Sequence, residues 1–138
     1  MTVVTTSRRS TTFTRAVARD LAFATGSKYL PRGKHGFREI SDEHDFFIVI
    51  HQQDQCIIMT AYQDSNPVIS RIINDHEEGL REKKIMRGVI TSDQKIEEML
   101  SPYCEVTLVD SDEMFISFDG PQKRWLKLKL VEDSASDA

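Results

Sequence analysis

Arginine and hydroxyl side chains crowd the beginning of the chain. Between Thr5 and Arg19 lie seven hydroxyl side chains and four arginines, with Asp20 as the acidic residue close by. Arg8 and Arg9 come directly before a predicted helix, whose free backbone N–H groups and positive dipole end favour an anion. An arginine fork also matches the geometry of a phosphate group. The stretch therefore predicts a phosphate-binding surface, because helix capping and solvation alone do not explain two adjacent arginines at this place.

The predicted phosphate surface extends beyond these two arginines. Arg15 and Arg19 face away from the apolar stripe of the predicted helix. Arg32 and Lys34 lie in the glycine-punctuated stretch PRGKHG and are expected to continue the surface. The plainer alternative makes Ser10 a helix cap and Arg19 a solvated residue. The full set of predicted contact residues is Arg8, Arg9, Arg15, Arg19, Arg32, Lys34, Ser7 and Ser10.

The last apolar stretch of the chain, RWLKLKL, offers a second kind of binding chemistry. In a strand, Trp125, Lys127 and Lys129 share one face, and the alternating leucines share the other. A tryptophan beside lysines can stack on a nucleic-acid base while the lysines hold phosphates. The alternative is that Trp125 packs under a helix while the lysines extend past it to solvent.

Other kinds of chemistry lack the residues that they need. The four histidines are scattered, with no spacing typical of a zinc site, and no glycine-rich nucleotide loop or nucleophilic serine elbow is present. The acidic run Asp110 to Glu113 lacks the spacing of a calcium loop and fits a turn. The sequence therefore predicts a protein that is not an enzyme, with no catalytic residues, metal or cofactor.

Charge is distributed unevenly along the 138 residues. Residues 1–40 carry eight basic and two acidic side chains, a balance of +6, and the remainder carries 10 basic and 20 acidic ones, a balance of −10. This asymmetry indicates that one face meets a polyanion. No apolar run reaches the roughly 20 residues that span a bilayer, and no signal peptide is visible. We expect a cytoplasmic protein in which Cys56 and Cys104 are free and buried.

Hydrophobic periodicity predicts a mixture of helices and strands in the first half. A helix capped by Ser10 or Thr11 runs to about Ala24 and ends at Gly26. The other predicted elements are a strand at 3–6, a short segment at 28–30, a helix near 37–44 and a hairpin over 45–63.

The second half is also predicted to mix strands and helix. Residues 65–90 are either two strands around DHEEG or a helix, and β-branched residues favour the strands. A helix over 93–100, capped by Ser92, precedes three strands at 105–109, 113–118 and 124–131. The fold class is therefore α/β with a mixed sheet, in one domain over 1–131, and residues 132–138 are expected to be a disordered tail.

One sequence pattern occurs twice in the chain, and several stretches resemble a known family. VVTTSR at 3–8 and GVITSD at 88–93 each combine a strand, a Thr-Ser pair and a following helix. The stretches TTSR at 5–8, TRAVARDLA at 14–22, YLPRGK at 29–34 and MRGV at 86–89 resemble the Brix domain of ribosome-biogenesis proteins, in its short stand-alone archaeal form. The resemblance implies two similar halves, about 1–85 and 86–131, each like the anticodon-binding domain of class IIa aminoacyl-tRNA synthetases.

The same resemblance implies a function. Brix-domain proteins bind ribosomal RNA precursors and help to process them and to assemble subunits without catalysis of their own. The expected partners are therefore precursor rRNA, and ribosomal proteins or other assembly factors, with the protein itself a monomer. The alternative function is a protein-interaction adaptor whose acidic second half docks a basic ribosomal protein.

Overall fold

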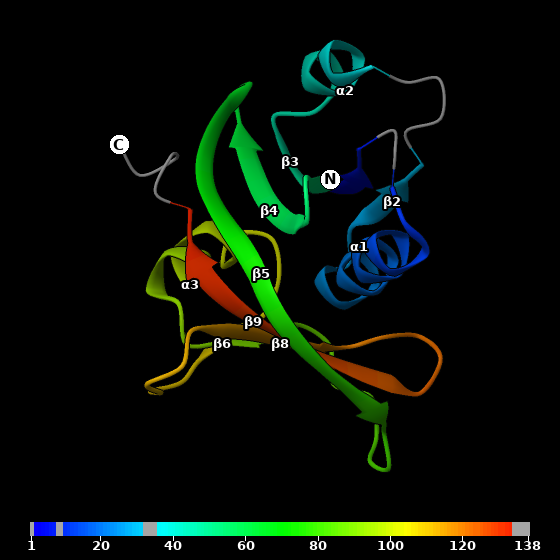
Figure 1. Cartoon of the computed structure of the whole chain (residues 1–138), viewed down its shortest axis with the longest axis vertical. Coiled ribbons are helices and arrows are strands. Elements are labelled where there is room, and N and C mark those ends of the chain that lie inside the picture. Colours follow the sequence, from blue (N-terminus) through cyan, green and yellow to red (C-terminus); the bar gives the residue numbers. More distant parts are fainter. Residues whose placement is uncertain (1, 8–9, 32–35, 134–138) are drawn as a thin grey trace.

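The computed structural model describes residues 2–7, 10–31 and 36–133. In these residues a nine-stranded mixed sheet runs in the order β2-β1-β3-β4-β5-β9-β8-β6-β7, and it curls so that its two ends face different ways (Figure 1). The elements are β1 (Val3–Thr6), α1 (Thr12–Thr25), β2 (Lys28–Leu30), α2 (Phe37–Glu43), β3 (Phe46–Gln53), β4 (Cys56–Gln63), β5 (Asn66–Leu80), β6 (Val89–Thr91), α3 (Gln94–Leu100), β7 (Val106–Leu108), β8 (Phe115–Asp119) and β9 (Arg124–Glu132).

Helix α1 forms as the sequence predicts. The Thr11 side chain caps it by accepting a hydrogen bond from the Thr14 N–H at 3.1 Å. Gly26 ends it in the left-handed conformation, at φ 69°, where a glycine costs least. Val17 and Leu21 of its apolar stripe are fully buried against the sheet.

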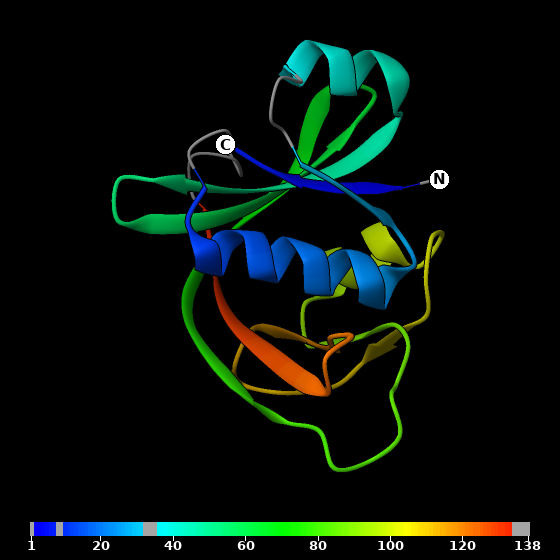
Figure 2. The same ribbon diagram turned by 90° about the vertical axis from the view of Figure 1, so that its right-hand side faces the viewer.

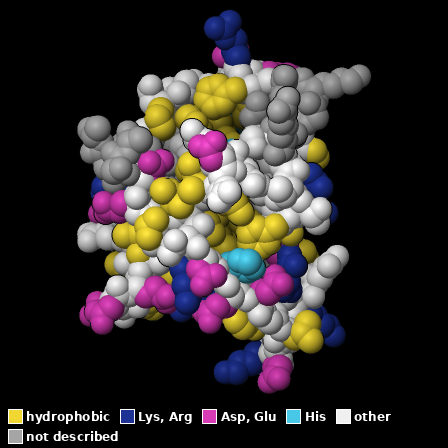
Figure 3. All heavy atoms as spheres, viewed as in Figure 1, with side chains coloured by type: hydrophobic (Ala, Val, Ile, Leu, Met, Phe, Trp, Pro, Cys, Tyr) yellow, Lys and Arg dark blue, Asp and Glu magenta, His cyan; other side chains and the backbone are white. Residues whose placement is uncertain are grey.

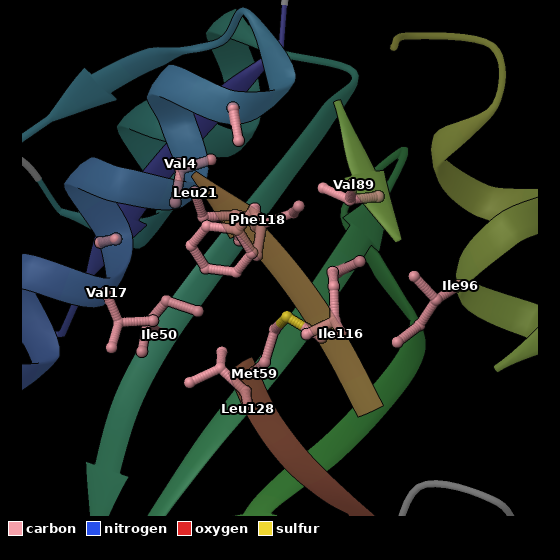
Figure 4. Close-up of a cluster of buried hydrophobic side chains, with 14 of the residues drawn as sticks. Val4, Val17, Leu21, Ile50, Met59, Val89, Ile96, Ile116, Phe118 and Leu128 are labelled. Atoms are coloured by element: carbon pink, nitrogen blue, oxygen red, sulfur yellow. The ribbon is translucent and has the colours of Figure 1, made fainter. Parts of the chain in front are cut away.

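The main core lies between the curled sheet and helices α1 and α3. Figure 4 shows Val17 and Leu21 of α1, Ile116 and Phe118 of β8 and Ile96 of α3 meeting in this layer. A smaller cluster lies on the opposite face of β1 and β3, under α2, and comprises Val3, Ile40, Phe47 and Val49. The chain therefore fixes α1 on one face of the sheet and α2 on the other.

Strand β5 joins the two parts of the sheet. Its first part pairs with β4 and its second part with β9, with a register irregularity between Ile73 and Asp75. The predicted strands are confirmed at 66–80 (β5) and from residue 89 (β6), whereas residues 81–88 between them form no strand. The predicted turn at DHEEG is wrong, because these residues continue β5. Two of the acidic side chains in that stretch lie opposite lysines, with Asp75 paired to Lys129 and Glu77 to Lys127. Cross-strand charge pairing of this kind stabilises a polar strand.

A buried ion pair attaches α3 to β5. The Arg71 Nε and the Asp93 Oδ2 are 2.7 Å apart, and the two side chains are 1% and 4% exposed. The other oxygen of Asp93 accepts the Lys95 N–H and caps α3. The predicted cap, Ser92, instead exchanges hydrogen bonds with the backbone of Glu113 and Phe115. The cap therefore lies one residue later than predicted, because Asp93 is the residue held in place by Arg71.

The cysteines only partly follow the prediction. Both are free, but Cys56 is exposed and Cys104 is half-buried. Cys56 begins β4 next to the hairpin turn, where side chains reach solvent. Burial raises the pKa of the Cys104 thiol. The prediction that both are buried is therefore wrong.

The two ends of the sheet share one arrangement. In β1–α1–β2 and in β6–α3–β7, a helix connects two parallel neighbouring strands. They differ in the next strand, since β3 runs parallel to β1 but β8 runs antiparallel to β6. The division into two superposable halves stays a prediction. Of the predicted tail, Glu132 ends β9 and Asp133 accepts a hydrogen bond from Ser70, and residues 134–138 lie outside the described residues.

Two glycines with positive φ differ in how closely the rest of the chain packs on them. Gly88 lies directly before β6, and Gly26 ends α1. Gly88 has φ 91°, and a Cβ there would lie 2.3 Å from the Glu105 carbonyl oxygen. Gly26 has φ 69°, but a Cβ there would meet nothing within 4 Å. We expect Gly88→Ala to lower the free energy of unfolding by about 2–4 kcal/mol. The control Gly26→Ala should cost about 1 kcal/mol. Urea unfolding of both variants measures the difference, and equal losses would contradict it.

Candidate nucleic-acid interface

The outward face of α1 carries the two helix arginines predicted for the phosphate surface. Both Arg15 and Arg19 are exposed. The Arg15 guanidinium donates to the Ser10 carbonyl oxygen at 2.7 Å and to the Ser10 Oγ at 3.2 Å. This contact folds Arg15 back over the start of α1. Arg19 has no side-chain partner among the described residues, and it lines a hollow with Gln122 of the turn between β8 and β9.

The remaining residues of the predicted opening surface are only partly placed. Arg8, Arg9, Arg32 and Lys34 lie outside the described residues. Ser7 follows β1, and its backbone N–H donates to the Ile50 carbonyl at 3.2 Å. Its hydroxyl is buried and has no hydrogen-bond partner within the part of the chain that the structure describes.

The turn between β8 and β9 is held against α1 by an ion pair. The Arg124 guanidinium and the Asp20 carboxylate are 2.6 Å apart. A hydrogen bond from Arg124 to Asp20 raises the pKa of Arg124 further above neutrality. Gly120 fits close to the same carboxylate, because a Cβ at this position would lie 2.8 Å from it. Asp20 therefore holds the turn, with Lys123 exposed at its end, beside the outward face of α1.

Residues 81–88 join the same region from the end of β5. The Arg81 N–H donates to the Lys123 carbonyl at 2.6 Å, and its guanidinium donates to the Gly120 carbonyl at 2.9 Å. The Arg87 guanidinium donates to the Phe23 carbonyl at 2.9 Å and lies over the Phe23 ring. Figure 2 shows this segment passing below β9 and rising toward the end of α1.

Three segments distant in sequence thus bring their cations to one region, which we call the basic corner. Its members come from α1, from the turn before β9 and from segment 81–88: Arg15, Arg19, Arg81, Lys83, Lys84, Arg87, Lys123 and Arg124. Lys83, Lys84 and Lys123 are exposed and have no side-chain partner among the described residues. Figure 3 shows Lys and Arg side chains at the lower end of the molecule and Asp and Glu side chains gathered at its lower left.

The last strand presents its predicted faces. Trp125, Lys127 and Lys129 are half-buried on one face of β9, and Leu126, Leu128 and Leu130 are buried on the other. The two lysines share one carboxylate, with Glu113 at 2.9 Å from Lys127 and 3.5 Å from Lys129. The hydrogen bond with Glu113 raises the pKa of Lys127 and lowers that of Glu113. A phosphate at these lysines would have to compete with that carboxylate.

Sequence reasoning predicted only Arg15 and Arg19 of the basic corner and missed its other six cations. Segment 81–88 reads REKKIMRG, with four cations in eight residues, and Lys123 follows shortly before β9. These cations were overlooked because the net charge was summed over residues 41–138, in which acidic side chains outnumber basic ones. The local density of Lys and Arg between two glycines was the signal that could have found them.

The described residues contain neither a cluster of candidate metal ligands nor a candidate membrane-spanning helix. Among the described residues, no group of three or more His, Cys, Asp or Glu side chains is placed to hold a metal ion. No described helix has the length and apolar character needed to cross a membrane.

The strand order and the placement of the helices define a mixed α/β domain with a curled nine-stranded sheet. The crystal structure of Mil (Mth680), an archaeal Imp4-like protein, has this fold, with a TM-score of 0.66 over 96% of this chain and 97% of that one. The fold is therefore Brix-like, which confirms at the level of the fold the resemblance found in the sequence. The two sequences are 15% identical. No family model and no curated protein matches this chain.

Proposed function

We propose that this protein is a non-enzymatic ribosome-biogenesis factor that holds precursor rRNA at the basic corner. The convergence of three cationic segments on one region is the observation that carries the proposal. The likeness to an Imp4-like protein supports the same class of function. We place its action in the cytoplasm, as a monomer that also meets ribosomal proteins or other assembly factors.

The proposed mechanism is electrostatic. Lysines and arginines that contact phosphates release the counterions condensed on RNA, and this release favours binding. Such contacts fix the position of the RNA but carry little sequence information. Selectivity should therefore come from the shape of the RNA or from a protein partner. Arg8, Arg9, Arg32 and Lys34 belong to the proposed surface on the sequence argument alone.

The proposal also includes the internal duplication. We infer that the halves 1–85 and 86–131 each correspond to an anticodon-binding-like unit, because β1–α1–β2 and β6–α3–β7 repeat one connection. An experimental structure in which these two units fail to superpose would contradict this part.

The test compares two exposed helix cations. Arg19 lies on α1 in the basic corner, whereas Lys95 lies on α3. We expect Arg19→Gln to weaken binding of rRNA fragments of any sequence. It should also reduce the slope of log affinity against log salt concentration by about 0.7–0.9. Lys95→Gln should leave both quantities unchanged. Titrations at increasing KCl concentration measure them.

A second candidate function is docking of a basic protein, favoured by the acidic side chains that gather away from the corner in Figure 3. If the wild-type protein binds no rRNA fragment at low salt but binds a basic ribosomal protein, the RNA proposal fails and this one replaces it. Equal effects of Arg19→Gln and Lys95→Gln would mean that the basic corner is not the RNA site.

A further inference from the structure

We propose that the groove beside Trp125 receives one unpaired RNA base, with Lys83 and Lys84 holding the adjoining phosphates. This inference rests on the proposed function and gives it a specific subsite. The groove lies between β9 and segment 81–88, and Trp125, Leu80, Met86, Asp119, Lys83 and Lys84 contribute to its lining.

The orientation of the tryptophan ring is fixed by a glycine. Gly79 of β5 pairs directly with Trp125 of β9. A Cβ at Gly79 would lie 2.8 Å from three atoms of the indole. These are the adjacent atoms Nε1, Cε2 and Cζ2, so one face of the ring lies flat on the glycine. The half-buried ring is thus held in place, and its accessible surface lines the groove.

The groove walls suit the flat apolar faces of a base. Leu80 is 80% exposed and Met86 is 40% exposed. Leu80 is therefore almost uncovered by the described part of the chain, and Met86 is partly covered. Stacking on an aromatic ring is tolerant of sequence, because every base has a π-face. Trp125 with these two apolar neighbours therefore provides a place for a base that has left its helix.

The polar groups of the groove favour a nucleotide over an apolar ligand. One carboxylate oxygen of Asp119 accepts the Met86 N–H at 2.9 Å, which ties segment 81–88 to β8. Its other oxygen has no partner among the described residues, so it can accept an N–H from a base edge. Lys83 and Lys84 belong to the same segment, and neither forms a side-chain hydrogen bond or ion pair with the described residues. They are placed to hold phosphates on either side of the stacked base, as in single-strand binding grooves.

Charge decides between RNA and an aromatic peptide as the occupant. The lining carries three cations, Arg81, Lys83 and Lys84, against the two acids Glu82 and Asp119. Arg81 and Asp119 each already make a hydrogen bond within the protein, so the two lysines are the cations left for a ligand. The groove also lies next to the rest of the basic corner, because the Arg81 N–H donates to the Lys123 carbonyl at 2.6 Å. Single-stranded RNA fits the groove better than an aromatic peptide, because its phosphates can contact the lysines and the basic corner while an unpaired base stacks on Trp125.

Trp125 reports on its own site, because it is the single tryptophan of the chain. The probes are a single-stranded RNA of about ten nucleotides and the fully paired duplex of the same sequence. We expect the single strand to quench the tryptophan fluorescence and the duplex to bind without quenching it. Trp125→Leu should weaken single-strand binding on the order of 10- to 100-fold and leave the salt slope unchanged. Trp125→Phe keeps an aromatic face, so its affinity for the single strand should fall less than that of Trp125→Leu.

The outcomes separate the subsite from the general proposal. Salt-dependent RNA binding that is equally tight in Trp125→Leu and wild type overturns the base site and leaves the basic corner standing. Quenching by the duplex as strong as by the single strand overturns it as well. Absence of any RNA binding by the wild type removes the proposed function and this inference together. If Trp125→Leu melts early, the wild-type comparison of single strand and duplex decides.

Discussion

Replacing Arg71 by Met is expected to lower the free energy of unfolding by about 3–5 kcal/mol, the loss found when one partner of a buried ion pair is removed. The Asp93 side chain, 4% exposed, would be left without its charged partner at the N-terminus of α3. The guanidinium bond to the Ser70 carbonyl would be lost too. Because Asp93 also caps α3, that helix should loosen first. Urea unfolding and hydrogen exchange of the α3 amides measure both effects.

A double variant separates the ion pair from the cap. In Arg71→Met with Asp93→Ser, no charge remains buried between β5 and α3, and the serine can still cap α3. The double variant should therefore recover much of the stability lost in Arg71→Met. A double-mutant cycle measures this recovery as the coupling free energy between the two positions. If Arg71→Met alone stays within about 1 kcal/mol of wild type, the pair does not hold α3 on β5.

The elements that the sequence predicts well are those with local signals. Helix α1 has its cap, its apolar stripe and its terminal glycine within one stretch, and the hairpin of β3 and β4 has two apolar runs around a short polar turn. The course of β5 depends on distant residues. Gly79 resembles a turn glycine in isolation, but it accommodates the indole of Trp125, 46 positions later in the numbering.

The candidate site follows the same division. The exposure of Arg15 and Arg19 follows from the helical period, which needs only neighbouring residues. Segment 81–88 lies beside α1 because Arg87 contacts Phe23 and Gly88 contacts Ala24. No pattern of neighbouring residues in the sequence predicts these contacts. The share of the binding surface carried by the second half could therefore be recognised only in the folded chain.

Charge reversal in that segment should give the largest change in RNA binding. We expect Lys83→Glu with Lys84→Glu to reduce affinity for rRNA fragments more than tenfold at low salt, and to reduce the salt slope by about 1.5–2. Both side chains are exposed and form no hydrogen bond or ion pair with the described residues, so stability should stay within about 0.5 kcal/mol of wild type. Filter binding across a KCl series and thermal unfolding provide the two measurements.

The matched control uses the lysines of β9. Lys127 and Lys129 are also neighbours in space, but both are paired with Glu113. Replacing both by Gln removes the same number of charges from a surface that Glu113 already neutralises in part. Its effect on the salt slope should be less than half of that seen with Lys83→Gln and Lys84→Gln, even though the sequence pattern alone ranks the β9 lysines higher. If the β9 pair changes the slope as much or more, RNA binds along the face of β9, and segment 81–88 is not the phosphate site.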